Sequence, residues 1–179
     1  MTVQRTVSPI DGSVLVERTL ATDTELEQAL ARADAAREPW AALSLPERAA
    51  LCTRMVDAFV AEGPAIAEEL TRQMGRPIRY SPGEVRGFEE RARSMIEGAA
   101  RALADHVPAP RPGFKRMIRH EPLGLVFTVA PWNYPYLTSV NSVIPALVAG
   151  NVVLLKHSAQ TPLCAERYAA AAERAGLPP

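Results

Sequence analysis

Asn133 and Lys156 are the side chains of this sequence best placed for chemistry, because each follows an apolar run. Asn133 comes after residues 123–130 and the dipeptide Pro131-Trp132, and Lys156 comes after residues 152–155. A neutral amide can donate N–H groups to a developing oxyanion without adding a charge of its own. The ammonium of a lysine at a strand end can donate to the hydroxyls or phosphates of a ligand.

A predicted strand–helix–strand unit places both side chains. Residues 123–130 form a continuous apolar run, which is typical of a strand buried on both faces, and residues 152–155 form a second one. Between them we expect a helix from about residue 138 to 149, interrupted or restarted at Pro145. Parallel strands joined by a helical crossover end on the same edge of their sheet. Asn133 and Lys156 are therefore expected at one rim, where open α/β sheets bind ligands.

Each of the two residues also has a purely structural explanation. Asn133 can close a Pro-Asn-Tyr-Pro turn through its own backbone, and Lys156 can simply extend from the strand end into solvent. Taken singly, the local spacing favours these explanations. The two residues together, at the two strand ends of one crossover, form a much more specific pattern.

Residues 1–103 predict an extended segment followed by four helices. A turn with an Asp-Gly pair lies at residues 8–12. Helices are expected from the capping boxes at Thr22 and Ser44, from Pro64 to Gly75, and from Ser81 to about residue 103. Arginines and glutamates interleave over residues 84–103, Glu84 included, which predicts a solvated face rather than a phosphate-binding stripe. A last helix is expected from Thr161-Pro162 to Gly176.

Residues 104–122 are expected to form an arm that pairs with another subunit. The proline-rich residues 107–113 break the preceding helix and cannot join a central strand. Residues 114–120 alternate loosely and carry basic side chains, which suits an edge or hairpin strand.

The composition argues against several classes of function. Lys plus Arg and Asp plus Glu balance at 20 each, so we expect neither nucleic acid nor a membrane surface as a partner. Two cysteines and three histidines without ligand spacing predict no disulfide framework and no metal site, and the expected location is cytoplasmic. Cys52 is expected to be structural, and Cys164, near a helix N-terminus, could have a somewhat lowered pKa.

Several motifs together resemble the aldehyde dehydrogenase superfamily. The weaker ones are Ser8-Pro-Ile-Asp-Gly12, Pro46-Glu-Arg-Ala49, and Met74-Gly-Arg-Pro77 with Glu84. The stronger ones, in series, are Pro131-Trp-Asn133, Pro145-Ala-Leu followed by Gly150-Asn151, and Lys156-x-Ser158-x-x-Thr161-Pro162. The resemblance extends over the whole chain.

The resemblance implies an α/β fold: an amino-terminal helical layer and the first βαβα half of a Rossmann-like parallel sheet, with a β-hairpin-like oligomerisation arm. Residues 1–103 and 123–179 would belong to the dinucleotide-binding domain and residues 104–122 to the arm. The catalytic domain, with its nucleophilic cysteine and general-base glutamate, would lie beyond this amino-terminal portion. We therefore expect little or no turnover from the 179 residues alone.

The implied activity is oxidation of an aldehyde to a carboxylic acid with NAD or NADP, in a homo-oligomer (dimer or tetramer). The resemblance assigns Asn133 to the oxyanion hole, Ala130, Trp132, Lys156, Ser158 and Ala159 to cofactor binding, and Tyr134 and Leu137 to the substrate channel. Two positions depart from the usual pattern: Ala159 replaces a ribose-binding glutamate, and Ser142 replaces a lysine associated with proton handling.

Two alternatives remain open from the sequence. One is a non-catalytic, truncated module that binds nucleotide or assembles subunits. The other is an acyl-phosphate or acyl-CoA reductase on the same scaffold, which the Pro-Trp-Asn turn disfavours.

Overall fold

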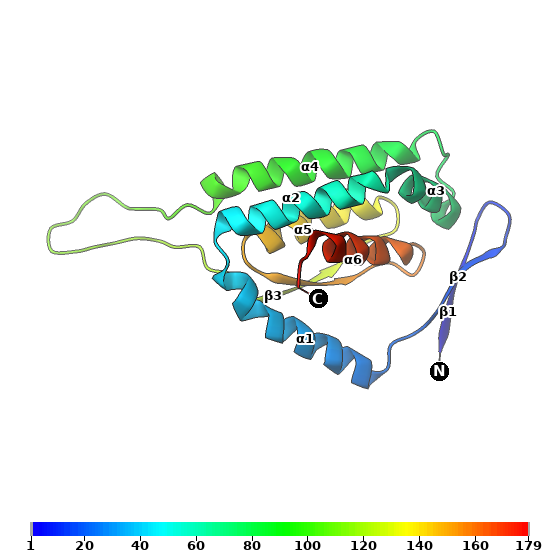
Figure 1. The fold of residues 1–179 in the computed structure, drawn as a ribbon, viewed down its shortest axis with the longest axis horizontal. Helices are drawn as coiled ribbons and strands as arrows, with labels where there is room; N and C mark the ends of the chain where they lie inside the picture. Colours follow the sequence, from blue (N-terminus) through cyan, green and yellow to red (C-terminus); the bar gives the residue numbers. More distant parts are fainter. Residues whose placement is uncertain (1, 179) are drawn as a thin grey trace.

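A computed structural model describes residues 2–178 of the chain. Helices pack on both faces of a short parallel sheet, and two hairpin-like segments extend from this body (Figure 1). Helices α2, α4 and α5 lie on one side of the sheet, and α1 lies on the other (Figure 1).

The amino-terminal part forms a hairpin and four helices, as the sequence predicts. Strands β1 and β2 pair in antiparallel fashion, and both predicted capping boxes are present, at Thr22 with Glu25 and at Ser44 with Glu47. The elements are β1 (Val3–Val7), β2 (Val14–Thr19), α1 (Asp23–Ala42), α2 (Leu45–Ala61), α3 (Gly63–Met74) and α4 (Ser81–Ala102).

The predicted βαβ unit is confirmed. Its elements are β3 (Leu125–Val129), α5 (Pro135–Val148) and β4 (Val152–Lys156), and α6 (Leu163–Ala175) follows. The strands run parallel, with Leu125 opposite Val152 and Val129 opposite Lys156. Helix α5 begins earlier than predicted, since Pro135 occupies its first turn, where a missing N–H costs nothing. It also continues through Pro145, so the predicted interruption is wrong.

The expectation that the first strand is buried on both faces is also wrong. Phe127 and Val129 are 61% and 64% exposed, whereas Thr128 between them is buried. Alternate side chains of a strand point to opposite faces, so one face of β3 meets α5 and the other is largely uncovered within residues 2–178.

The predicted arm, residues 104–122, protrudes from the body as a long loop (Figure 1). It holds two isolated antiparallel bridges, between His106 and Ile118 and between Arg111 and Phe114, rather than a continuous strand. Prolines in this segment remove donors that a regular ladder would need.

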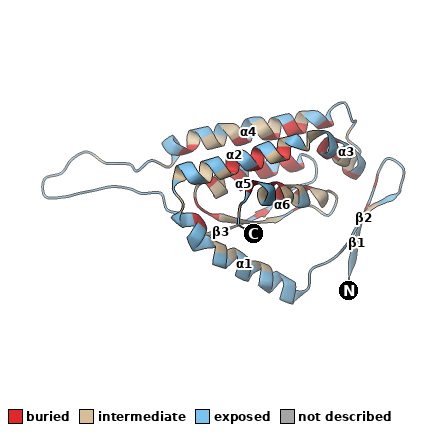
Figure 2. Ribbon diagram, viewed as in Figure 1, coloured by how far each residue is buried: buried red, intermediate tan, exposed pale blue. Residues whose placement is uncertain are grey.

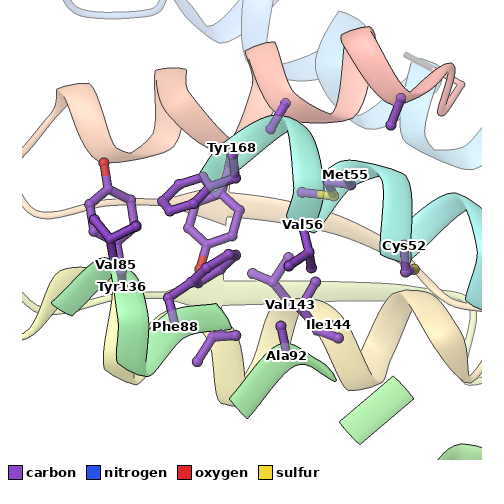
Figure 3. Packing of buried hydrophobic residues seen from close by; sticks show 14 of the residues in the cluster. Cys52, Met55, Val56, Val85, Phe88, Ala92, Tyr136, Val143, Ile144 and Tyr168 are labelled. Carbon is purple, nitrogen blue, oxygen red and sulfur yellow. The ribbon is translucent and has the colours of Figure 1, made fainter. Parts of the chain in front are cut away.

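The hydrophobic core lies between α2, α4, α5 and α6, whereas the arm, the amino-terminal hairpin and most of α1 are exposed (Figure 2). Four aromatic rings form its centre: those of Phe59, Phe88, Tyr136 and Tyr168. The Phe59 ring lies 4.1 Å from that of Phe88 and 4.9 Å from that of Tyr136, between centroids. Figure 3 shows Phe88, Tyr136 and Tyr168 directed into this shared space. The packing fixes α5, and with it the turn that precedes the helix.

Candidate functional site

The ends of the two parallel strands meet at one edge of the sheet, as predicted. The backbone N–H of Ala130 donates to the carbonyl of Lys156 at 3.0 Å. The Trp132-Asn133-Tyr134 turn leaves this edge from β3, and the loop of residues 157–162 leaves it from β4. The structure therefore brings the candidate residues of the two motifs to a common rim.

Asn133 lies exposed in the turn between β3 and α5. Its side-chain amide makes no hydrogen bond with any residue in the range 2–178, so the amide does not close the turn on its own backbone. Its backbone carbonyl, in contrast, accepts a hydrogen bond of 2.8 Å from Nη2 of Arg76. The amide is thus free to donate outward, and its position depends on the backbone.

Glu84 is buried, contrary to its predicted place on a solvated helix face. Its side chain is almost fully covered and forms an ion pair with Arg76. Its Oε1 accepts from the backbone N–H of Tyr136 at 2.9 Å and of Leu137 at 3.3 Å, in the first turn of α5. The alternating charges misled the prediction, because one glutamate of the run faces the next helix.

A cleft of about 570 Å³ opens beside the turn. Tyr134 and Leu137, the predicted substrate-channel residues, both line it, together with Met74, Gly75, Arg76, Pro77, Tyr80, Gly83 and Glu84. The guanidinium of Arg76 lies 4.7 Å from the centre of the Tyr134 ring, within cation–π range. The cleft therefore brings Tyr134 and Leu137 together with residues 74–77 and Glu84, which the sequence connects to them only through the family resemblance.

Lys156 and Ala159 are exposed on the other side of the rim, and Ser158 is half-buried. The loop that carries them is fixed by the amino-terminal hairpin: the carbonyl of Ala159 accepts from Nε2 of Gln4 at 2.7 Å and from Oγ1 of Thr6 at 2.8 Å. Ser158 Oγ accepts from the backbone N–H of Gln160, within the loop itself.

His157 points the opposite way from Lys156. It is 7% exposed, and neither imidazole nitrogen has a hydrogen-bond partner in the described part of the chain. Its ring stacks 6.5 Å from that of Tyr168. Burial, together with the neighbouring charge of Lys156, lowers the pKa of His157 from 6.5 to about 4. The imidazole is therefore neutral at pH 7.

Both cysteines are buried and poorly suited to nucleophilic chemistry. Burial raises the pKa of Cys52 and that of Cys164 to about 12. The expected lowering of the Cys164 pKa is wrong, because removal from water outweighs any effect of the helix N-terminus. Only a thiolate attacks carbonyl carbon readily. Within residues 2–178 no group of His, Cys, Asp and Glu side chains is arranged to hold a metal ion.

Comparison with known proteins agrees with the motifs and the geometry. The sequence model of the aldehyde dehydrogenase family matches residues 2–179. The chain belongs to the aldehyde dehydrogenase family. It is 34% identical to succinate-semialdehyde dehydrogenase [NADP(+)] 1 of Mycobacterium bovis over 175 residues, 97% of this chain and 38% of that protein. It is 32% identical to 3-sulfolactaldehyde dehydrogenase of Pseudomonas putida over 171 residues, 96% of this chain and 35% of that protein.

The fold is also that of this family. The crystal structure of PnpE in complex with nicotinamide adenine dinucleotide superposes with a TM-score of 0.92 at 29% identity, covering 99% of this chain and 36% of that one. The chain thus spans little more than a third of the length of the relatives that it matches. Among the described residues, no helix combines the length and the apolarity needed to traverse a bilayer.

Proposed function

We propose that this chain is the amino-terminal, cofactor-binding part of an NAD(P)-dependent aldehyde dehydrogenase that oxidises an aldehyde to a carboxylic acid. The observation that carries the proposal is the common rim, where the unengaged amide of Asn133 and the exposed ammonium of Lys156 flank the ends of two parallel strands. Residues 1–103 and 123–179 are assigned to the dinucleotide-binding domain, and residues 104–122 to oligomerisation.

The groups at the rim suit a dinucleotide. Lys156 and Ser158 offer donors to the adenine-side ribose, and Trp132 with the carbonyl of Ala130 offers a surface and an acceptor to the nicotinamide ribose. Trp132 is half-exposed, so its indole is available to a ligand. When bound, the nicotinamide accepts the hydride of the oxidised aldehyde.

Asn133 acts on the aldehyde in this proposal. Attack of a thiolate on the carbonyl carbon places negative charge on oxygen, and the amide N–H of Asn133 stabilises that charge. The thiolate is supplied from elsewhere in the enzyme, since neither Cys52 nor Cys164 is exposed or ionised at neutral pH. The family resemblance assigns the base that activates water to the same catalytic domain. Tyr134 and Leu137 border the path of the aldehyde along the cleft.

The main test is Asn133→Ala in the protein that combines this chain with the nucleophile. Loss of one oxyanion donor typically lowers kcat by on the order of 10²–10³. We expect this loss in the acylation step, measured in a single turnover, with dinucleotide affinity nearly unchanged. Lost cofactor affinity with unchanged single-turnover chemistry would show that Asn133 is only a turn residue.

Cofactor choice is proposed to include NADP alongside NAD. A carboxylate near the adenine ribose repels a 2′-phosphate, and Ala159 cannot do so, while Lys156 and Ser158 supply a positive charge and a donor. We expect Lys156→Ala to weaken the binding of NADP more than that of NAD. Ala159→Glu should shift the ratio of kcat/KM for the two cofactors towards NAD. A strict NAD preference that Ala159→Glu leaves unchanged would place the discrimination elsewhere.

The arm is proposed to join two copies of the chain into a dimer or tetramer. It exposes large apolar side chains, with Val107, Phe114, Met117 and Ile118 each more than half exposed. Light scattering on the parent and on a variant lacking residues 107–119 tests this proposal. Equal masses for the two, both monomeric at high concentration, would contradict it.

A further inference from the structure

We propose that the buried pair Arg76–Glu84 is the device that positions Asn133, so that both are positioning residues for the acylation step. This inference rests on the oxyanion role proposed for Asn133. The pair lies outside the two strand-end motifs, and Glu84 is 52 and 53 residues away in sequence from the backbone groups that it binds.

Glu84 supplies the cap that α5 does not make for itself. The N-cap residue, Tyr134, offers no side-chain hydrogen bond to the first turn. Oε1 of Glu84, from α4, accepts the N–H groups of Tyr136 and Leu137 instead, at 2.9 Å and 3.3 Å. A carboxylate is favoured at a helix N-terminus, because the unpaired N–H groups and the helix dipole both attract negative charge. The start of α5 is thereby tied to α4.

Arg76 ties the other end of the same turn. It forms the ion pair with Oε2 of Glu84, its Nη2 donates to the carbonyl of Asn133 at 2.8 Å, and its guanidinium covers the Tyr134 ring. The carbonyl of Asn133 and the first N–H groups of α5 are thus fixed by one connected pair of side chains. The planar guanidinium can serve both partners at once, which a single ammonium does poorly.

The arrangement bears on chemistry more than on stability. A buried ion pair often contributes little net stability, because desolvating two charges offsets their attraction. The Asn133 side chain has no hydrogen bond of its own within residues 2–178, so the pair can position the amide only through the backbone, which sets the direction of the Cα–Cβ bond. Displacement of a reacting or stabilising group by about 1 Å can cost on the order of 10²-fold in rate. A rigid backbone at Asn133 is therefore what an oxyanion donor requires.

The test is a double variant, Arg76→Met with Glu84→Gln, in the protein that contains this chain and the nucleophile. The glutamine carbonyl still caps α5 and no charge is left buried alone, but the link to Asn133 is gone. We expect single-turnover acylation at saturating aldehyde to fall by about 10²-fold, with the dinucleotide Kd nearly unchanged. The control on the same helix is Arg93→Met with Glu89→Gln, a partly exposed pair, which should leave acylation unaltered.

The same double variant in the Asn133→Ala background separates the possible outcomes. If the pair acts through Asn133, it should cause no further loss of acylation there. An equal, multiplicative loss in both backgrounds would assign the pair a general structural role and overturn the inference, while leaving the proposed function intact. If Asn133→Ala itself leaves acylation unchanged, the oxyanion proposal fails instead.

A second measurement, which needs no enzymatic activity, uses the 179-residue chain. The ¹⁵N order parameter of the Asn133 backbone should fall from a rigid value to below about 0.6 in the double variant, and should stay rigid in the Arg93 and Glu89 control. An Asn133 backbone equally rigid in both would contradict the positioning role.

Discussion

The buried, neutral His157 makes folding stability depend on pH in a defined window. The pKa of His157 is about 4 in the folded chain and 6.5 when the imidazole is free in water. Between these values the unfolded chain binds a proton that the folded chain does not, so the free energy of unfolding rises with pH across the window. The contribution of the neutral His157 to folding stability is therefore fully present well above pH 6.5 and is lost as the pH falls through about 4.

The size of the effect follows from the two pKa values. At pH 5 the protonation of the unfolded chain lowers the free energy of unfolding by about 2 kcal/mol, and at still lower pH the loss approaches about 3 kcal/mol. A typical domain is stable by about 5–15 kcal/mol, so a loss of this size is readily measured. Protonation of carboxylates also lowers the free energy of unfolding at low pH. The pH dependence of a variant that lacks the imidazole must therefore be subtracted from that of the parent.

His157→Phe is that variant, because a phenyl ring keeps the aromatic packing against Tyr168 and cannot titrate. Urea denaturation at pH 7.5, 6.5, 5.5 and 5.0 should show the parent losing about 2 kcal/mol more than His157→Phe between the extremes. His106→Phe, at an exposed position of the arm, should follow the parent curve. Parallel curves for the parent and His157→Phe would refute the assignment of a depressed pKa to this buried ring.

Other consequences of the fold can be tested on the same chain. Gly150→Ala should destabilise the protein by about 1–3 kcal/mol in urea denaturation, since the backbone φ there is +92° and the new methyl group would lie 2.9 Å from Pro122. Gly98→Ala, in open space within α4, should instead stabilise it by about 0.5–1 kcal/mol; destabilisation of equal size in both variants would contradict this account. A thiol reagent at pH 7.5 should label Cys52 and Cys164 slowly in the folded chain and rapidly in urea, and fast labelling without urea would show that one thiolate is accessible.

The parts of the fold that the sequence predicts well are those that local rules decide. The capping boxes at Thr22 and Ser44 form as the spacing predicts, and Gly176 ends the last helix in a left-handed conformation. The common edge of β3 and β4 follows from the handedness and length of one crossover. These features need no knowledge of what lies elsewhere in the chain.

The wrong predictions concern burial, which local rules do not decide. Glu84 belongs to a run of charges that alternates like a solvated face, yet it meets the start of a helix that lies far along the chain. Cys164 stands near a helix N-terminus, but packing removes its thiol from water and raises its pKa instead. Phe127 is predicted to be buried, but it is exposed because α1, the described helix on that side of the sheet, covers little of that face of β3.

Framework elements without chemistry of their own hold both halves of the candidate site. Arg76 and Glu84 hold the turn of Asn133 from the helical layer, while Gln4 and Thr6 hold the loop beyond Lys156 from the amino-terminal hairpin. This explains how the family's motifs can be spread over the chain while its candidate ligand-binding groups gather at one rim.

The burial of His157 and the exposure of Lys156 are two results of one backbone geometry. Successive side chains of an extended segment point to opposite faces, so a buried imidazole requires that the preceding ammonium point out. A shift of this strand's register by one residue would expose the imidazole of His157 and bury the ammonium of Lys156. Burying an unpaired ammonium costs far more free energy than burying a neutral imidazole. The aromatic packing around His157 therefore keeps Lys156 at the rim, and at pH 7 the neutral ring leaves Lys156 as the cation of this residue pair.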